Sequence, residues 1–238
     1  LVAGAVDHHG VGGAGAGAQE SKADSAKTKL PVVVVAASRT AASLYATPLA
    51  VTQLRKSMWQ GTSGYGLNDA LSLVPGVLAQ SRYGNNDIRL IIRGFGSRGA
   101  GDRSNSGTSR GVRILVNGIP ETEPDGRTSF DGVDLAAAEG IEVVRSNASA
   151  LWGNAAGGVV NISTIPDFAT GFAEEENVIG GFGLKRFALK GGTRLGDARA
   201  FGTVVNSSLD GWRRNSASSR TIFDGGIVAP LGDRTTFT

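Results

Sequence analysis

The segment IEVVRSNASALWGNAAGGVVNIST, residues 141–164, places two short apolar runs on either side of a stretch rich in small and polar residues. The first run begins at Ile141 and the second at Val159. β-Branched residues favour strands, whereas Gly, Asn and Ser favour turns. The segment therefore predicts two strands, at residues 141–145 and 159–162, joined by an irregular connection.

The residues that precede this segment predict further short elements. Residues 67–74, LNDALSLV, place Leu67, Leu71 and Val74 on one helical face, and a Pro-Gly pair follows them. Short apolar runs predict strands at residues 88–93 and 112–117 and an Asp-capped helix at residues 134–139. We therefore expect an α+β domain with a small mixed sheet and short helices that ends near Pro166.

The pattern changes after this domain. From about Asn177 apolar and polar residues alternate, and Phe187 and Leu189 are examples. The sequence LGDARAF, residues 195–201, recurs as LGDRTTF, residues 231–237. A period of two predicts antiparallel strands, and Gly-Asp predicts a tight turn. Both a transmembrane β-barrel and a soluble β-sandwich alternate in this way, so the pattern leaves both open.

Composition excludes several classes of protein. The chain has 238 residues, of which 36 are glycine and none is cysteine, so a disulfide framework and a thiolate metal site are excluded. The net charge is +3, the basic residues are scattered, and aromatic residues make up 6%, which disfavours nucleic-acid binding. No apolar run approaches the roughly 18 to 20 residues of a membrane-spanning helix, whereas the strands of a β-barrel are shorter.

Nothing in the sequence predicts catalysis. No Ser/His/Asp or paired-carboxylate arrangement is present, and His8 and His9 lie in a Gly/Ala-rich segment, residues 1–29. We expect this segment to be a leader or a flexible N-terminus, with Ala16-Gly17-Ala18 as a candidate cleavage site for an export signal. We expect no enzyme activity, no metal site and no cofactor.

Residues 90–99, LIIRGFGSRG, match the G-x-G-x-x-G pattern of dinucleotide-binding loops. That site needs a helix after the third glycine, but the next twelve residues contain no Leu, Ile, Val, Phe or Met. A soluble nucleotide-binding enzyme is therefore disfavoured. The same loop gathers side chains that could bind an anionic or hydroxyl-rich ligand, and the alternative is a solvated connection. These side chains are Arg98, Arg103, Asn105 and Arg110.

Five segments, taken in order, resemble the plug domain of TonB-dependent outer-membrane transporters. They are VVVVAASRT at residues 32–40, LNDALSLVPGV at 67–77, IRGFG at 92–96, RILVNGIP at 113–120, and residues 141–164. The family usually has Asp where Asn117 stands, and Gly-Pro where Ser146-Asn147 stand. The resemblance implies a plug at residues 30–166 and, at residues 167–238, the first strands of a barrel of about 22 strands, here incomplete.

The resemblance also implies a function. Such proteins sit as monomers in the lipid of the bacterial outer membrane, with the plug facing the barrel lumen and the periplasm. They import scarce, bulky ligands, and a ferric siderophore is the leading class here. The inner-membrane TonB protein, with its ExbB–ExbD motor, supplies the energy. A motor-independent receptor or a passive barrel channel is the alternative.

Two groups of residues carry these expectations. The first is a candidate TonB box at residues 30–37, which could add as a strand to a partner sheet or could simply be the first plug strand. It comprises Val32, Val33, Val34, Val35 and Ala36. The second group would pair with charges on the barrel wall and comprises Arg93, Glu142 and Arg145. For Glu142, salt bridges within the plug are an equal alternative.

Overall fold

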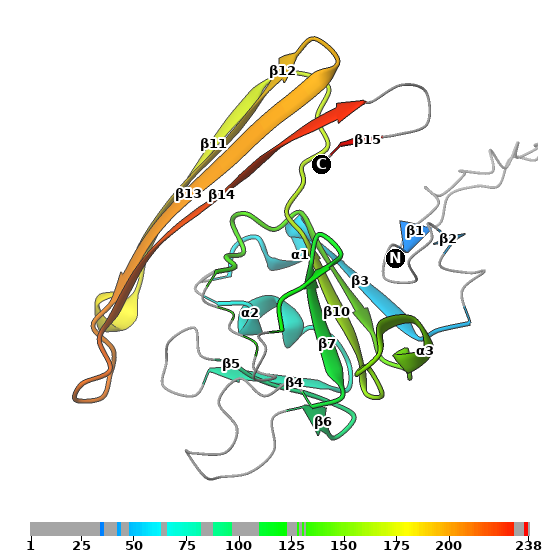
Figure 1. Ribbon diagram of the computed structural model, residues 1–238. Helices are drawn as coiled ribbons and strands as arrows, with labels where there is room; N and C mark the ends of the chain where they lie inside the picture. The colour runs from blue at the N-terminus through cyan, green and yellow to red at the C-terminus, as the bar shows by residue number, and fades with distance from the viewer. Residues whose placement is uncertain are drawn as a thin grey trace, which may run out of the picture. The chain divides into compact units, whose positions relative to one another are not determined.

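A computed structural model describes residues 34–35, 42–43, 48–62, 66–81, 88–96, 110–122, 128, 130, 132–230 and 236–237. All of these belong to one compact unit formed by residues 32–238. The chain order separates them into a mixed α+β part and a run of long antiparallel strands (Figure 1).

The mixed part is built on a five-stranded sheet with the strand order β3-β9-β10-β7-β8. Its strands are β3 (Val51–Arg55), β7 (Val112–Val116), β8 (Ile119–Pro120), β9 (Gly140–Val144) and β10 (Gly158–Ser163). β10 pairs with β7 in parallel and with β9 antiparallel. The predicted strands at residues 112–117, 141–145 and 159–162 are confirmed to within two residues.

The apolar runs of β9 and β10 explain why these strands lie at the centre of the sheet. Both faces of β9 are buried, which suits Ile141, Val143 and Val144, while the one charged residue between them, Glu142, accepts a hydrogen bond from Gln53. One face packs on α2 (Asn68–Leu71) and its neighbours through Leu67, Leu71 and Val74. The helical face predicted for residues 67–74 is therefore buried, although α-helical geometry is limited to the four residues of α2.

A second, three-stranded sheet joins β4 (Val77–Ser81), β5 (Ile88–Ile92) and β6 (Phe95–Gly96). β5 turns directly into β6 through Arg93 and Gly94, which both have positive φ, 50° and 81°. Two consecutive left-handed residues make the turn of a tight β-hairpin. The first glycine of the G-x-G-x-x-G pattern thus serves a hairpin, and does not begin a phosphate-binding loop.

The other helices are also short: α1 (Lys56–Trp59) and α3 (Ser149–Trp152). Across the described residues, no helix has the length and apolar character needed to cross a membrane. The helix predicted at residues 134–139 is wrong, because this segment makes only one turn. Its Asp cap is present, since Asp134 Oδ1 accepts from the backbone N–H of Ala136 at 2.8 Å. Glu139 N–H then donates to Ser163 O at 2.7 Å, which commits the chain to the sheet before a second turn forms.

Two short strands, β1 (Val34–Val35) and β2 (Ala42–Ser43), pair antiparallel and form a small separate sheet. Val34 lies opposite Ser43 in the register. The predicted strand in the valine run is therefore present over these two residues.

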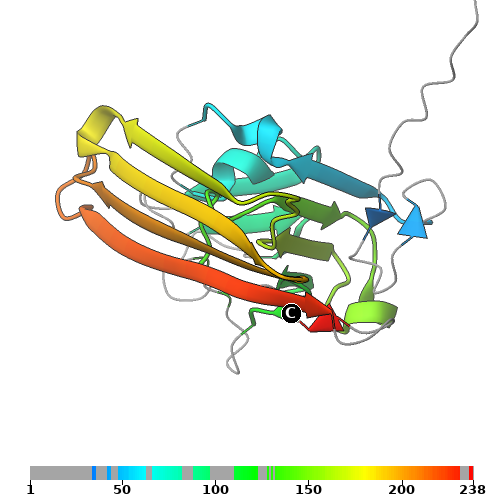
Figure 2. The ribbon, with the colours of Figure 1, turned by 90° about the horizontal axis from the view of Figure 1, so that it is seen from above.

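The rest of the described chain forms a second five-stranded sheet in the order β11-β12-β13-β14-β15. Its strands are β11 (Phe172–Ile179), β12 (Lys185–Leu195), β13 (Ala198–Leu209), β14 (Ser218–Pro230) and β15 (Thr236–Phe237). Figure 2 shows the long yellow to red strands side by side. The tight turn predicted at Gly196-Asp197 joins β12 to β13, whereas its second copy, in residues 231–235, lies outside the described residues.

Candidate functional site

The long antiparallel strands have two unlike faces. The register places three rows of residues on one face, which we call the inner face. The rows are Arg186–Ser207–Arg220, Ala188–Val205–Ile222 and Lys190–Thr203–Asp224. Arg186, Lys190, Thr203 and Ser207 are all buried, so two of the three rows are polar and covered, and the row between them is apolar.

The opposite, outer face carries large apolar side chains that are exposed. They are Ile179, Phe187, Leu189, Leu195, Phe223 and Ile227. A sheet of a soluble β-sandwich buries its apolar face and leaves its polar face in water. These strands do the reverse, which is the pattern of strands whose outer face meets lipid.

The inner face is covered by the single turn at residues 134–139, which we call the docking turn. The Asp134 carboxylate accepts from two arginines on different strands, Arg186 Nη2 at 2.6 Å and Arg220 Nη2 at 2.5 Å. The side chains of Asp134 and Arg186 are 0% and 1% exposed. Glu176 on β11 lies 3.2 Å from Arg186 Nη1 and adds a second negative charge. A buried charge is tolerated only when it is paired in this way.

A second ionic contact fixes the other end of the docking turn. Lys190 Nζ forms an ion pair with the Glu139 carboxylate and donates to the backbone carbonyl oxygens of Ala137 at 3.1 Å and Ala136 at 3.4 Å. These carbonyls belong to a turn that was too short to use them in helical hydrogen bonds. The lysine thus satisfies polar groups that the missing second helical turn leaves open.

An apolar contact lies between the two charged ends. Ala136 packs against Ala188, Val205 and Ile222, the middle row of the inner face. The docking turn therefore presents one matching group to each row: the Asp134 carboxylate to the first, the Ala136 methyl group to the second and the Glu139 carboxylate to the third. Complementary charges in this order fix the register of the turn on the strands.

A cavity of about 360 Å³ borders the docking turn and lies between α1, β11 and β12. Three cations line it, Lys56, Arg186 and Lys190, and each already forms an ion pair. Lys56 pairs with Glu174 on β11. Because these charges are compensated, the arrangement suits a joint between two parts of the chain better than a ligand site.

The described part of the chain holds no group of three or more His, Cys, Asp or Glu side chains placed to bind a metal ion. Nor does the docking turn combine a nucleophile with a general base, since its charged groups are engaged with one another. The chemistry available here is electrostatic and mechanical: ion pairs that hold two elements together and can be broken.

The candidate TonB box is only partly described. Val34 and Val35 form β1, whereas Val32, Val33 and Ala36 lie outside the described residues. β1 pairs with β2 along one edge. Its role in binding a partner therefore stays a prediction.

The predicted ligand-facing loop is likewise represented by one residue. Arg110 is exposed, and its carbonyl oxygen accepts from Gly96 N–H at 2.7 Å, which ties the end of the loop to β6. Arg98, Arg103 and Asn105 lie outside the described residues. The ligand contact of this loop also stays a prediction.

Two of the three predicted plug–barrel residues, Glu142 and Arg145, make side-chain hydrogen bonds to described residues of the α+β part. Gln53 Nε2 donates to Glu142 Oε1 at 2.9 Å, and Arg145 Nη1 donates to Pro75 O at 3.1 Å. Arg93 is exposed in the β5–β6 turn. Glu142 borders an open cavity of about 490 Å³, which leaves room for a further side chain. Pairing of these residues with a barrel wall stays a prediction.

The residues that join the docking turn to the long strands were not predicted from the sequence. They are Asp134, Glu139, Arg186, Lys190 and Arg220. A usable pattern was present, since Arg186 and Lys190 share one face of a strand whose other face carries Phe187 and Leu189. The pattern could not reveal that the charged face is the buried one.

Residues 43–159 match the family model of the TonB-dependent receptor plug domain. The chain belongs to the TonB-dependent outer-membrane receptors. The matched residues include the docking turn and the five-stranded sheet, except that the match ends at Val159, within β10. The antiparallel strands that follow are strands of the barrel, and the α+β part is the plug.

Two curated relatives illustrate the family. The chain is 30% identical over 134 residues to a vitamin B12 transporter, BtuB, of Vibrio vulnificus strain CMCP6, and 27% identical over 146 residues to a hemin receptor of Yersinia pestis. These matches cover 56% and 61% of this chain. The aligned part spans 20% of the length of each relative.

A solved structure shows the same fold over most of the chain. The ferripyoverdine receptor of the outer membrane of Pseudomonas aeruginosa superposes with a TM-score of 0.68 at 16% identity. The superposition covers 86% of this chain and 26% of the receptor. The predicted fold class, an α+β plug followed by antiparallel barrel strands, is therefore confirmed.

Proposed function

We propose that this chain is the plug and the first barrel strands of a receptor that actively imports a bulky, scarce ligand across the bacterial outer membrane. TonB would bind the valine run at residues 32–36 and, with ExbB–ExbD, would supply the energy. We keep the predicted division into a plug at residues 30–166 and barrel strands at residues 167–238. The change from mixed to antiparallel pairing between Ser163 and Phe172 supports this division.

The observation that carries the proposal is the docking turn on the inner face. A barrel of about 22 strands would leave an open lumen, so a transporter of this kind needs a domain that blocks it. Here the plug turn meets polar barrel residues through ion pairs rather than through a large apolar interface. Such contacts hold the plug closed, and a pulling motor can break them and re-form them without exposing an apolar core.

A ferric siderophore is the ligand class we favour. The ferripyoverdine receptor shares the fold, while the relatives named above take up vitamin B12 or bind hemin, so bulky ligands are common to all three. The arginines of residues 98–110 suit an anionic chelate. Uptake of ⁵⁵Fe as catecholate, hydroxamate and mixed-ligand siderophores by cells that express the full-length protein would identify the class.

Motor coupling is tested at Val34 in the full-length protein. Proline has no N–H and cannot donate to a partner strand, whereas alanine keeps the main-chain hydrogen bonds. We expect Val34→Pro to abolish uptake of the ⁵⁵Fe-siderophore while binding to whole cells is retained, and Val34→Ala to transport normally. Unchanged uptake by Val34→Pro would favour the alternative, a motor-independent receptor or a passive channel.

A further inference from the structure

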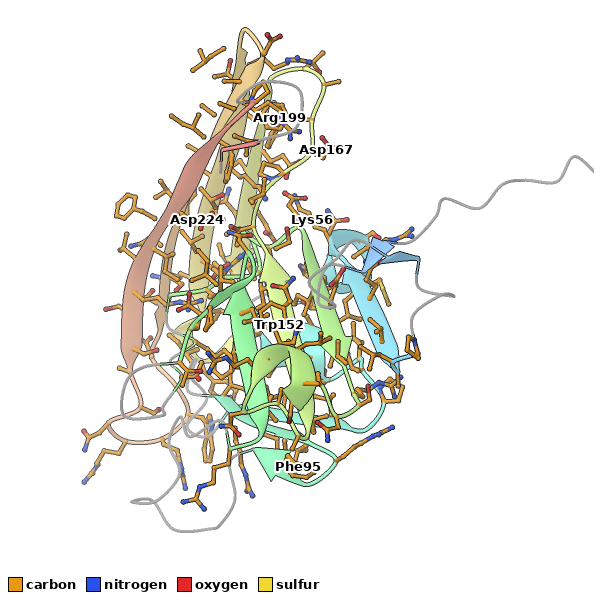
Figure 3. The ribbon with its side chains drawn as sticks, turned by 45° about the vertical axis from the view of Figure 1, so that its right-hand side comes forward. Lys56, Phe95, Trp152, Asp167, Arg199 and Asp224 are labelled. Atoms are coloured by element: carbon orange, nitrogen blue, oxygen red, sulfur yellow. The ribbon has the colours of Figure 1, made fainter. Side chains whose placement is uncertain are left out.

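Three side chains connect the plug sheet to the barrel strand β14. Asn117 follows β7, Thr164 follows β10, and Asp224 lies in the third row of the inner face (Figure 3 labels Asp224). Thr164 N–H donates to Asn117 Oδ1 at 2.8 Å, and Asn117 Nδ2 donates to Thr164 Oγ1 at 2.9 Å. Thr164 Oγ1 in turn lies 3.4 Å from Asp224 Oδ1. Thr164, the middle residue, is buried, whereas Asn117 is exposed and Asp224 is half-buried.

The chemistry of these groups fixes the direction of the hydrogen bonds. A backbone N–H can only donate, so the Asn117 atom that faces Thr164 N must be the oxygen. The amide nitrogen then faces Thr164 Oγ1 and donates to it. The hydroxyl has one hydrogen, which is left free to be donated to the carboxylate of Asp224.

We propose that Asn117 is a positioning residue that sets the direction of a hydrogen-bond relay, Asn117 to Thr164 to Asp224, which fastens the plug sheet to β14. The relay shares no hydrogen bond with the docking turn, although Lys190, which holds that turn, also attracts the Asp224 carboxylate electrostatically. It depends on neither the ligand nor motor coupling. The bond from the Thr164 hydroxyl to Asp224 Oδ1 matters because the other carboxylate oxygen, Oδ2, is buried and has no hydrogen-bond partner among the described residues. The Thr164 hydroxyl is therefore the neutral donor that holds this carboxylate.

The relay makes an asymmetric prediction for exchanges of Asn and Asp. With Asn117→Asp the Thr164 hydroxyl must turn toward residue 117, and Asp224 loses its donor while a second carboxylate faces the same hydroxyl. With Asp224→Asn the relay survives, because an amide oxygen still accepts from Thr164. With both changes the relay runs backwards, from Asn at 224 through Thr164 to Asp at 117, and the Thr164 hydroxyl again both donates and accepts.

The test uses the full-length receptor in outer-membrane vesicles. The vesicles are incubated with a protease at increasing urea concentrations, and the readout is the midpoint, the urea concentration at which half of the plug is cut. We expect Asn117→Asp to lower this midpoint by about 0.5 M, the size expected for one lost hydrogen bond. Asp224→Asn should lie near the wild-type midpoint. The double variant should recover the midpoint of Asp224→Asn.

The same variants in a Thr164→Val background provide the control. Without the hydroxyl no relay exists, so Asp224→Asn should no longer rescue Asn117→Asp. Rescue that persists in this background would show repulsion between two carboxylates through space and would overturn the relay. A wild-type midpoint for Asn117→Asp, or a failure of the double variant to recover in the Thr164 protein, would overturn it as well.

Discussion

At the scale of single residues, Gly158 shows how closely two plug strands approach. Gly158 begins β10 with φ of +146°, and a Cβ atom there would lie 2.1 Å from the carbonyl oxygen of Val144. We expect Gly158→Ala to destabilise the plug by about 2–4 kcal/mol, because a side chain meets both a strained backbone and a fixed carbonyl. Calorimetry of the plug transition in the full-length protein measures this.

The matched control for this prediction is Gly132→Ala. Gly132 has no heavy atom within 4 Å of an added Cβ. This variant should therefore unfold at the wild-type temperature or slightly above it, since alanine reduces the freedom of the unfolded chain. Equal transition temperatures for both variants would show that the close approach at Gly158 relaxes at no cost.

At the scale of elements, the docking turn is held by one carboxylate that serves two barrel strands. Asp134→Asn keeps the shape of the side chain but leaves Arg186 and Arg220 without their shared counter-ion. Arg186 is buried but keeps Glu176 as a partner, so we expect the contact between the plug and the strands to weaken by about 1.5–3 kcal/mol, the size of a lost hydrogen bond to a charged group. The urea midpoint for proteolysis of the plug in the full-length receptor should fall accordingly.

The control at this scale is an exposed pair of the same kind. Asp167 pairs with Arg199 Nη1 at 2.5 Å, but the Asp167 side chain is 99% exposed, and the two lie together in Figure 3. Water and salt screen such a pair, so Asp167→Asn should leave the midpoint unchanged. If Asp134→Asn behaved like Asp167→Asn, the docking turn would contribute no more than a surface contact.

The strands and the docking turn also show which parts of the structure could be predicted from the sequence. Mostly apolar runs predicted the central strands of the plug, since a strand buried on both faces needs apolar residues on both; Glu142 and Asn161 are the polar exceptions. The helix propensity of Ala136–Ala138 predicted a helix. The helix ends after one turn because Glu139 N–H donates to Ser163 O, and the Lys190 ammonium takes the Ala137 carbonyl oxygen as an acceptor. These competing contacts come from residues distant in sequence, which local patterns cannot report. The partners of Asp134, Arg186 and Arg220, are also distant in sequence, so local patterns could not predict these ion pairs.

At the scale of the whole molecule, the two faces of the barrel strands decide where the chain can reside. Charged residues on both sides of one apolar row lie between the strands and the plug, and the exposed large apolar residues point away from the plug. Alternation alone predicted two faces but could not assign them, because a soluble sandwich alternates equally well. The burial of Arg186 and Lys190 beneath the docking turn identifies their face of the strands as the one that meets the plug.

Phe223 tests this assignment directly. It lies on the outer face in register with Val204, is 77% exposed, and its neighbours in chain, Ile222 and Asp224, face the plug. A charged side chain on a lipid-facing strand costs about 2–4 kcal/mol near the bilayer midplane. We therefore expect Phe223→Arg to lower the fraction of full-length protein that folds into lipid vesicles, measured by its heat-modifiable mobility on gels. Ala217→Arg, in the exposed β13–β14 loop, should fold like the wild type. Normal folding of Phe223→Arg would mean that water or protein, and not lipid, contacts this face.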